Sequence, residues 1–393
     1  MLIDTKINNF KLPYIVQYDK DYYIELSEYL NRYLNHLNQI PNLDQECLDS
    51  TKSNINLINE SLKLYNNANI GEAKECIKKM LAKYCNSPYI VATLDKNYAF
   101  RGIAPDDIPK KYNYDKVYAD IYRKMNNHPL SFYKARVAVE AIKRIDMLHI
   151  PFDKRGLITT QRFSIAGVPC LYVATTALGC WLEMEIPEFD VFQVSSYKLP
   201  NDLKVLNLCI SQYIINSPGY LEEDELYDFH NFIEIFPLVC ATSFKVQELN
   251  RKFKSEYIVS QLLMQVTTEL GIDGIAYLSK KMDDYYAYPQ AVNLAIPITC
   301  DRFPPYNEKL LEMYWKDANK IKLTDAYRFS EFLKRYPEDN DKPKPPYSSY
   351  ANEIYHDSHH NKVLLYGKVI EYTETRFSEF DEFLLNQKHC DFK

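Results

Sequence analysis

Residues 162–183 read RFSIAGVPCLYVATTALGCWLE and are the most informative part of this 393-residue chain. Arg162 stands ten residues before Tyr172, and Glu183 stands eleven residues after that tyrosine. The arginine supplies a forked, permanent cation that suits a phosphate. The tyrosine offers an aromatic face with a polar tip that can stack on a base. The glutamate supplies a carboxylate for a ribose hydroxyl or for positive charge on a sugar ring. Together these groups indicate a nucleotide ligand.

Both strand and helix patterns follow this stretch. SEYIVSQLLMQVTTEL (255–270) has the pattern of a helix, and Gly271 follows it where a left-handed cap is expected. Because strands and helices mix without a regular βαβ alternation, the sequence predicts an α+β fold. It contains no G-x-G-x-x-G and no Walker sequence, which disfavours Rossmann and P-loop sites. The predicted strands are FDVFQVSSYKL (189–199), LKVLNLC (203–209), GIAYLS (274–279) and AVNLAIPI (291–298).

The two flanks suggest additions to a central domain. Apolar residues at helical spacing predict three helices in the first hundred residues. After residue 300 we expect a helix over 307–334, a proline-rich break at 336–350, a hairpin at 362–372 and a terminal helix. The predicted domains are therefore 1–100, 101–300 and 301–393. The apolar stripes of the N-terminal helices are Tyr23, Leu26, Leu30, Tyr33 and Leu37; Ile55, Ile58, Leu62 and Tyr65; and Ala73, Ile77, Met80 and Tyr84.

Composition excludes several classes of protein. The formal net charge is −6 and no long block of Lys or Arg occurs, so wrapping of nucleic acid as the main task is not expected. No window approaches the roughly 20 apolar residues of a membrane span, and the N-terminus lacks a signal-peptide pattern. The nine cysteines form no C-x-x-C pair, which favours free thiols in a reducing compartment. We expect a soluble, cytoplasmic protein.

Residues 132–298 resemble a RES domain, the family of bacterial NAD-degrading toxins named after its Arg, Glu and Ser. In this chain the family pattern runs from Arg162-Phe163-Ser164 through GVPCLYVA (167–174) to Glu183, and the spacing between these motifs matches that of the family. FYKAR (132–136) resembles the opening strand of the family, which makes Arg136 a second candidate cation. DGIAYLS (273–279) and AVNLAIP (291–297) resemble two later strands and add Ser279 and Asn293 as candidates.

The resemblance implies attack on NAD+ by water or by inorganic phosphate, with release of nicotinamide. It implies a core similar to the ADP-ribosyltransferase-like fold, a toxin or defence role, and a cognate antitoxin as partner. Glu183 would stabilise the oxocarbenium-like ribose and Tyr172 would orient it, while Arg162 and Arg136 would hold the pyrophosphate or the attacking phosphate. Ser279 and Asn293 would donate or accept neutral hydrogen bonds. No metal and no cofactor beyond NAD+ as substrate is expected, and the oligomeric state stays open.

Simpler interpretations stand beside these. Arg162 could serve a structural ion pair, Tyr172 a strand core and Glu183 a solvated helix face. The charged residues around Lys280 indicate an exposed loop that could act as a lid. The histidines of YHDSHH (355–360) favour a solvated turn over a metal site. Two other functions remain open: transfer of ADP-ribose to a macromolecule, and an interaction protein that binds through its N-terminal helices.

Overall fold

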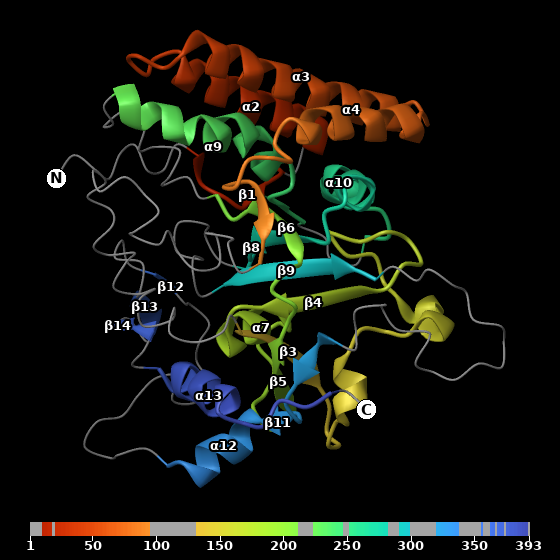
Figure 1. The fold of residues 1–393 in the computed structure, drawn as a ribbon, viewed down its shortest axis with the longest axis vertical. Coiled ribbons are helices and arrows are strands. Elements are labelled where there is room, and N and C mark those ends of the chain that lie inside the picture. Colours follow the sequence, from red (N-terminus) through yellow and green to blue (C-terminus); the bar gives the residue numbers. More distant parts are fainter. Residues whose placement is uncertain are drawn as a thin grey trace. The chain divides into compact units, whose positions relative to one another are not determined.

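The computed structural model describes residues 10–17, 20–94, 131–210, 223–246, 251–281, 291–298, 320–337, 355–356, 362–365, 368–372 and 375–391 (Figure 1). The chain divides into two compact units. Unit 1 comprises Met1–Ala92, Thr159–Ala166 and Lys204–Tyr285, and unit 2 comprises Thr93–Ile158, Gly167–Leu203 and Tyr286–Lys393. This division differs from the boundaries predicted at residues 100 and 300, because each unit is assembled from separate stretches of sequence.

Three helices near the N-terminus confirm the periodic pattern of the sequence: α2 (Tyr22–Leu37), α3 (Gln45–Asn66) and α4 (Ile70–Ala82). The side chains of Asp21 and Asp44 accept hydrogen bonds from backbone N–H groups in the first turns of α2 and α3, as N-cap residues do. Two residues of the predicted stripes are not buried: Tyr65 is only half-buried, and Tyr23 is exposed. Tyr23 is 36% exposed, and its neighbour Tyr22 is buried instead, since the Tyr22 hydroxyl donates to the Ala241 carbonyl at 2.7 Å.

The N-terminal helices share a core with later parts of unit 1. In Figure 1 the red and orange helices α2, α3 and α4 lie beside the green helix α9 (Glu223–Ala241), and α4 also packs against α10 (Ile258–Glu269). Asn54 of α3 donates hydrogen bonds to the Tyr84 hydroxyl at 2.7 Å and to the Glu234 carbonyl of α9 at 2.8 Å. The helical region predicted as a separate domain is therefore an integral part of unit 1.

The strands of unit 1 are short. β6 (Lys204–Leu208) pairs in parallel with β8 (Gly274–Leu278), and β2 (Val91–Thr93) lies next to β6. β1 (Tyr14–Ile15) pairs in parallel with β7 (Phe244–Lys245). A 3₁₀ turn, η5 (Ser255–Tyr257), leads into α10, and Gly271 follows that helix with a φ of 68°. The expected left-handed glycine at the end of this helix is confirmed.

Unit 2 contains an antiparallel sheet with the strand order β10–β5–β3–β4–β9. A further short strand, β11 (Tyr327–Arg328), also pairs with β5. Two 3₁₀ turns, η2 (Arg144–Met147) and η3 (Phe152–Leu157), separate β3 from β4. The five strands are β3 (Ser131–Val137), β4 (Cys170–Ala174), β5 (Phe192–Lys198), β9 (Val292–Pro297) and β10 (Lys322–Leu323).

The two faces of β3 have different neighbours. Tyr133 points to the side of the helices α7 (Ala177–Glu183) and α13 (Arg376–Leu385), because its hydroxyl donates to the Asp381 carbonyl at 3.2 Å. Phe132 points to the other side, together with its register partner Tyr197. The Tyr197 hydroxyl donates to the Met147 carbonyl of η2. Helices α7 and α13 therefore cover one face, and η2 lies on the other.

The prediction of a helix over 307–334 is confirmed only for its last six residues, 329–334, and is wrong for 320–328. Residues 307–319 lie outside the described residues, and 320–328 contain β10 and β11. Ile321 and Leu323 are buried while Lys322 between them is exposed. This alternation is typical of a strand, and the segment is a short strand that pairs with β5. The helix is limited to α12 (Phe329–Arg335).

The C-terminal part confirms the expected hairpin and terminal helix. β13 (Lys362–Leu365) pairs with β14 (Lys368–Glu371), and β12 (Tyr355–His356) pairs with β13. Figure 1 shows α12 and α13 in blue, and Phe329 of α12 stacks on Phe377 of α13 with ring centroids 4.6 Å apart. The proline-rich break beyond Pro337, and the histidines at 359 and 360, lie outside the described residues.

The architecture is mixed helix and sheet, which confirms the α+β class. All eight described cysteines are free thiols. Within the described ranges, no group of His, Cys, Asp and Glu is arranged to hold a metal ion. None of the helices in these ranges has the length and apolar character needed to cross a bilayer.

Candidate functional site

Two predicted site residues of unit 2, Glu183 and Asn293, meet at the end of helix α7. Glu183 is the last residue of this helix and is exposed. Asn293, on β9, is only 4% exposed and donates a hydrogen bond from Nδ2 to Oε1 of Glu183 at 2.7 Å. The amide fixes one carboxylate oxygen in place, and a bond of this kind to a charged acceptor is stronger than one between neutral groups.

Tyr172 lies on the same face as this pair. On the paired strands β4 and β9, Tyr172 is the register partner of Ala295, and Ala174 is the register partner of Asn293. Since side chains alternate along a strand, Tyr172, Ala174 and Asn293 point to one side. Tyr172 is partly exposed, and its side chain forms a hydrogen bond with the thiol of Cys170, whose pKa burial raises to about 12. Unit 2 thus presents a carboxylate, an amide and a phenol together.

Arg136 lies on the opposite face of the sheet. It alternates with Tyr133 on β3, and Tyr133 is the register partner of Ala174, so Arg136 points away from the face that carries Tyr172 and Asn293. Its guanidinium donates to the Leu148 carbonyl at 3.0 Å, and the ammonium of Lys134 donates to the same oxygen at 3.2 Å. Burial, followed by the charge of Arg136, lowers the pKa of Lys134 to about 7. The structure does not bring Arg136 to Glu183.

Arg162, in unit 1, is surrounded by backbone carbonyls. Part of the residue is exposed, but its guanidinium donates to the carbonyl oxygens of Phe244 at 2.6 Å, Thr242 at 3.0 Å and Glu256 at 3.4 Å. It also lies over the Tyr257 ring, 4.8 Å from the centroid. Burial lowers the pKa of this arginine, which nevertheless stays charged at neutral pH. Both terminal nitrogens of the guanidinium thus donate to backbone carbonyls.

Ser279, also in unit 1, stands at the end of β8 and is 1% exposed. Its hydroxyl accepts a hydrogen bond from the Lys281 backbone N–H at 3.2 Å. The next residue, Lys280, donates from Nζ to the hydroxyl of Ser243 at 2.7 Å. Ser243 lies between Thr242 and Phe244, two of the three residues whose carbonyls accept from Arg162. Lys280, just after β8, and the Arg162 guanidinium therefore contact the same short segment, 242–244. Two cationic side chains of unit 1, those of Arg162 and Lys280, therefore bind to this segment.

The structure therefore forms two clusters from the predicted residues. In unit 2, Tyr172, Glu183 and Asn293 share one face. In unit 1, Arg162 and Lys280, the residue after Ser279, contact segment 242–244. Sequence reasoning treated Lys280 only as part of a charged loop. It also missed Asp381, although a signal was present: Asp381 falls on the apolar stripe of α13 with Phe377, Phe380 and Leu384. A carboxylate in an apolar stripe needs a buried partner.

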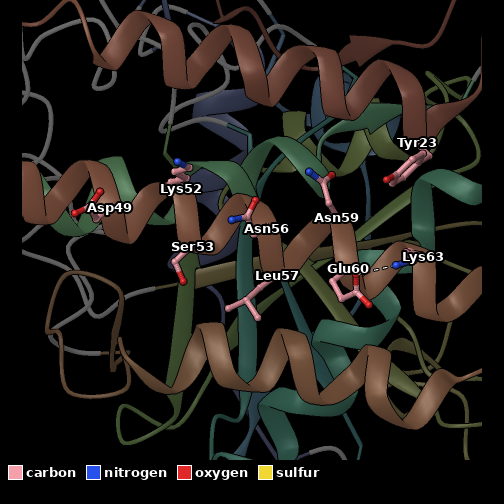
Figure 2. A pocket seen from close by; sticks show the side chains of 9 residues that line it. All are labelled: Tyr23, Asp49, Lys52, Ser53, Asn56, Leu57, Asn59, Glu60 and Lys63. Atoms are coloured by element: carbon pink, nitrogen blue, oxygen red, sulfur yellow. Dashed lines mark ion pairs between the residues drawn. The ribbon is translucent and has the colours of Figure 1, made fainter.

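A surface hollow of about 600 Å³ in unit 1 contains none of these residues. Figure 2 shows that it runs along the outer face of α3, with Tyr23 of α2 at one end and an ion pair between Glu60 and Lys63. Only Leu57 is aliphatic among its lining residues. Small-molecule sites are concave and mainly apolar, so we do not assign a ligand to this surface.

Comparison with known proteins gives a relative that matches part of the chain. No protein-family model matches the chain, and no solved structure matches it. Over 185 residues the chain is 34% identical to a protein of Bacillus subtilis (strain 168) named "Putative toxin YopC". The match covers 43% of this chain and 41% of the relative, so the chain spans about two fifths of the length of the curated relative it matches. The chain is thus similar, over less than half of either sequence, to a protein that is named as a toxin.

Proposed function

We propose that this protein cleaves the bond between nicotinamide and ribose in NAD+, and that it acts as a toxin. The observation that carries the proposal is the hydrogen bond between Asn293 and the exposed carboxylate of Glu183, with Tyr172 on the same face. The relative that is named as a toxin supports the role. An antitoxin protein as partner is part of the proposal.

The chemistry of the bond fits such a cluster. Nicotinamide leaves as a neutral ring, and positive charge develops on the ribose as the bond breaks. A fixed carboxylate beside the ribose lowers the energy of that state because its charge is already oriented. The Asn293 amide fixes the Glu183 side chain, and the phenol of Tyr172 offers a surface for the ribose or the nicotinamide ring.

Water or inorganic phosphate then attacks the anomeric carbon. Water gives ADP-ribose and a proton, and phosphate gives ADP-ribose phosphorylated at the same carbon. The resemblance assigns Arg162 to the pyrophosphate or the attacking phosphate and Ser279 to a neutral hydrogen bond.

The experiment is incubation of the purified protein with NAD+, with and without phosphate, followed by ¹H and ³¹P NMR of the products. We expect release of nicotinamide by the wild type and a loss of at least about 100-fold in kcat for Glu183→Gln. Glu188→Gln is the matched control, since Glu188 is an exposed carboxylate nearby in sequence. Absence of nicotinamide release under both conditions would refute the proposal.

A further inference from the structure

Helix α7 is too short to determine its own orientation. It has seven residues, Ala177–Glu183, and isolated helices of this length are unstable in water. Its last residue carries the carboxylate that meets Asn293. The direction of that carboxylate therefore depends on contacts that other parts of unit 2 make with the two ends of α7.

The first end is held by the C-terminal helix α13. Oδ1 of Asp381 accepts the backbone N–H of Ala177 at 2.8 Å, and Oδ2 accepts the hydroxyl of Tyr372 at 2.6 Å. Thr176, the N-cap residue, accepts the N–H of Gly179 at 2.9 Å. Asp381 is 8% exposed, so water does not replace these bonds easily. A residue 204 positions away in sequence thus binds the first N–H of the Glu183 helix.

Helix α13 is itself fixed to the sheet and to the side of α7. The Tyr133 hydroxyl donates to the Asp381 carbonyl at 3.2 Å, and the Cys180 thiol donates to the Tyr133 carbonyl at 3.2 Å. The rings of Trp181 and Phe377 lie 5.3 Å apart. These contacts connect β3, α7 and α13 into one packed group.

The second end of α7 is a strained turn. Glu185 and Ile186 have φ values of 63° and 58°, in the left-handed region that residues other than glycine rarely adopt. For a β-branched residue such as Ile186 this conformation is an outlier. Hydrogen bonds hold it: the Ile186 N–H donates to the Trp181 carbonyl at 3.0 Å, and the Trp181 indole donates to the Pro187 carbonyl at 2.9 Å. Strain of this kind persists where the surroundings fix a functional group.

We propose that Asp381 and the strained turn at Glu185–Ile186 are positioning elements that hold α7 so that Glu183 meets Asn293. The inference rests on the proposed function of Glu183, but the contact itself can be tested without it. The C-terminal segment 375–391 then belongs to the active part of the protein rather than to an extension.

The experiment compares Asp381→Asn, Ile186→Gly and the control Glu188→Gln. Asparagine keeps an oxygen for the Ala177 N–H but changes the bond with Tyr372. Ile186 is 40% exposed and glycine adopts its φ without strain, so this variant keeps its fold. We expect both variants to lose roughly tenfold to hundredfold in kcat with little change in KM, while the Tm of Ile186→Gly equals or exceeds that of the wild type. The control should match the wild type.

A second readout separates this inference from the proposed function. The side-chain amide resonance of Asn293 in ¹⁵N NMR reports its bond with Glu183 whether or not NAD+ is cleaved. We expect it to shift in Asp381→Asn and Ile186→Gly toward its position in Glu183→Gln. If that resonance and kcat both stay at the wild-type values in the two variants, the positioning role is refuted. If the wild type is inactive but the resonance shifts as expected, the contact stands and only the function fails.

Discussion

Replacement of Arg162 by methionine tests whether this residue supports the fold of unit 1. The guanidinium donates to three backbone carbonyls, two of them at 3.0 Å or less, and lies over the Tyr257 ring. Hydrogen bonds to a charged group contribute about 1.5–3 kcal/mol each, and a cation over an aromatic ring contributes about 0.5–2 kcal/mol. Burial of the guanidinium offsets part of this sum. We therefore expect Arg162→Met to lower the free energy of unfolding by about 3–4 kcal/mol.

Two further variants show how much of this loss in the free energy of unfolding comes from the hydrogen bonds to the carbonyls. Arg162→Lys keeps the charge but cannot reach all three carbonyls with a single ammonium, so it should cost about 2 kcal/mol. Lys254→Met is the matched control, because Lys254 lies over the same Tyr257 ring at 5.6 Å without the carbonyl contacts. It should cost less than about 1 kcal/mol.

Urea unfolding followed by circular dichroism measures the three free energies. Hydrogen exchange of peptides from β7 and α10 shows whether the loss lies in unit 1. A loss below about 1 kcal/mol for Arg162→Met, with unchanged exchange in β7, would refute a structural role.

Two other predictions concern the C-terminal part of unit 2. Burial raises the pKa of Asp381 to about 7, above the usual value of 3.8, so the protonated carboxyl favours the folded state. The free energy of unfolding should therefore fall by at most about 4 kcal/mol as pH rises from about 4 to about 7. Asp381→Asn should remove this pH dependence, as measured by urea unfolding at several pH values. A variant with the wild-type slope would contradict this. Phe329 is fully buried and stacks on Phe377, so Phe329→Ala should lower the free energy of unfolding by about 3–5 kcal/mol, and a loss under about 1 kcal/mol would show that α12 is not part of the core.

Local patterns predicted most of the regular elements. The three N-terminal helices, the strands β5, β6, β8 and β9, and the C-terminal hairpin follow from apolar spacing, which depends only on neighbouring residues. The region around Ile321 was misassigned because a short strand is stabilised by its partner, β5, and not by its own sequence. The assignment of Tyr23 instead of Tyr22 to the core was wrong for a similar reason. Tyr22 is the buried residue because its hydroxyl donates to the distant Ala241 carbonyl.

The candidate site could be predicted only in part. The resemblance, carried by the spacing within residues 162–183 and by AVNLAIP (291–297), pointed to Glu183 and Asn293, and the structure joins them by one hydrogen bond of 2.7 Å. The same spacing gave no information on the carbonyls around Arg162, because backbone groups carry no sequence signal. It also gave none on the face to which Arg136 points. The bond from Ala177 to Asp381 joins residues far apart in sequence, and no local pattern can reveal such a contact.

The discontinuity of unit 1 has a consequence for biosynthesis. About 140 residues separate the end of α4 from the beginning of α9, and α9 supplies the surface on which α3 packs. At roughly 5–20 residues per second, a ribosome needs on the order of ten seconds to deliver that surface. During this time the emerging N-terminal helices expose their apolar stripes. A chaperone can therefore bind these apolar stripes on the nascent chain before unit 1 folds.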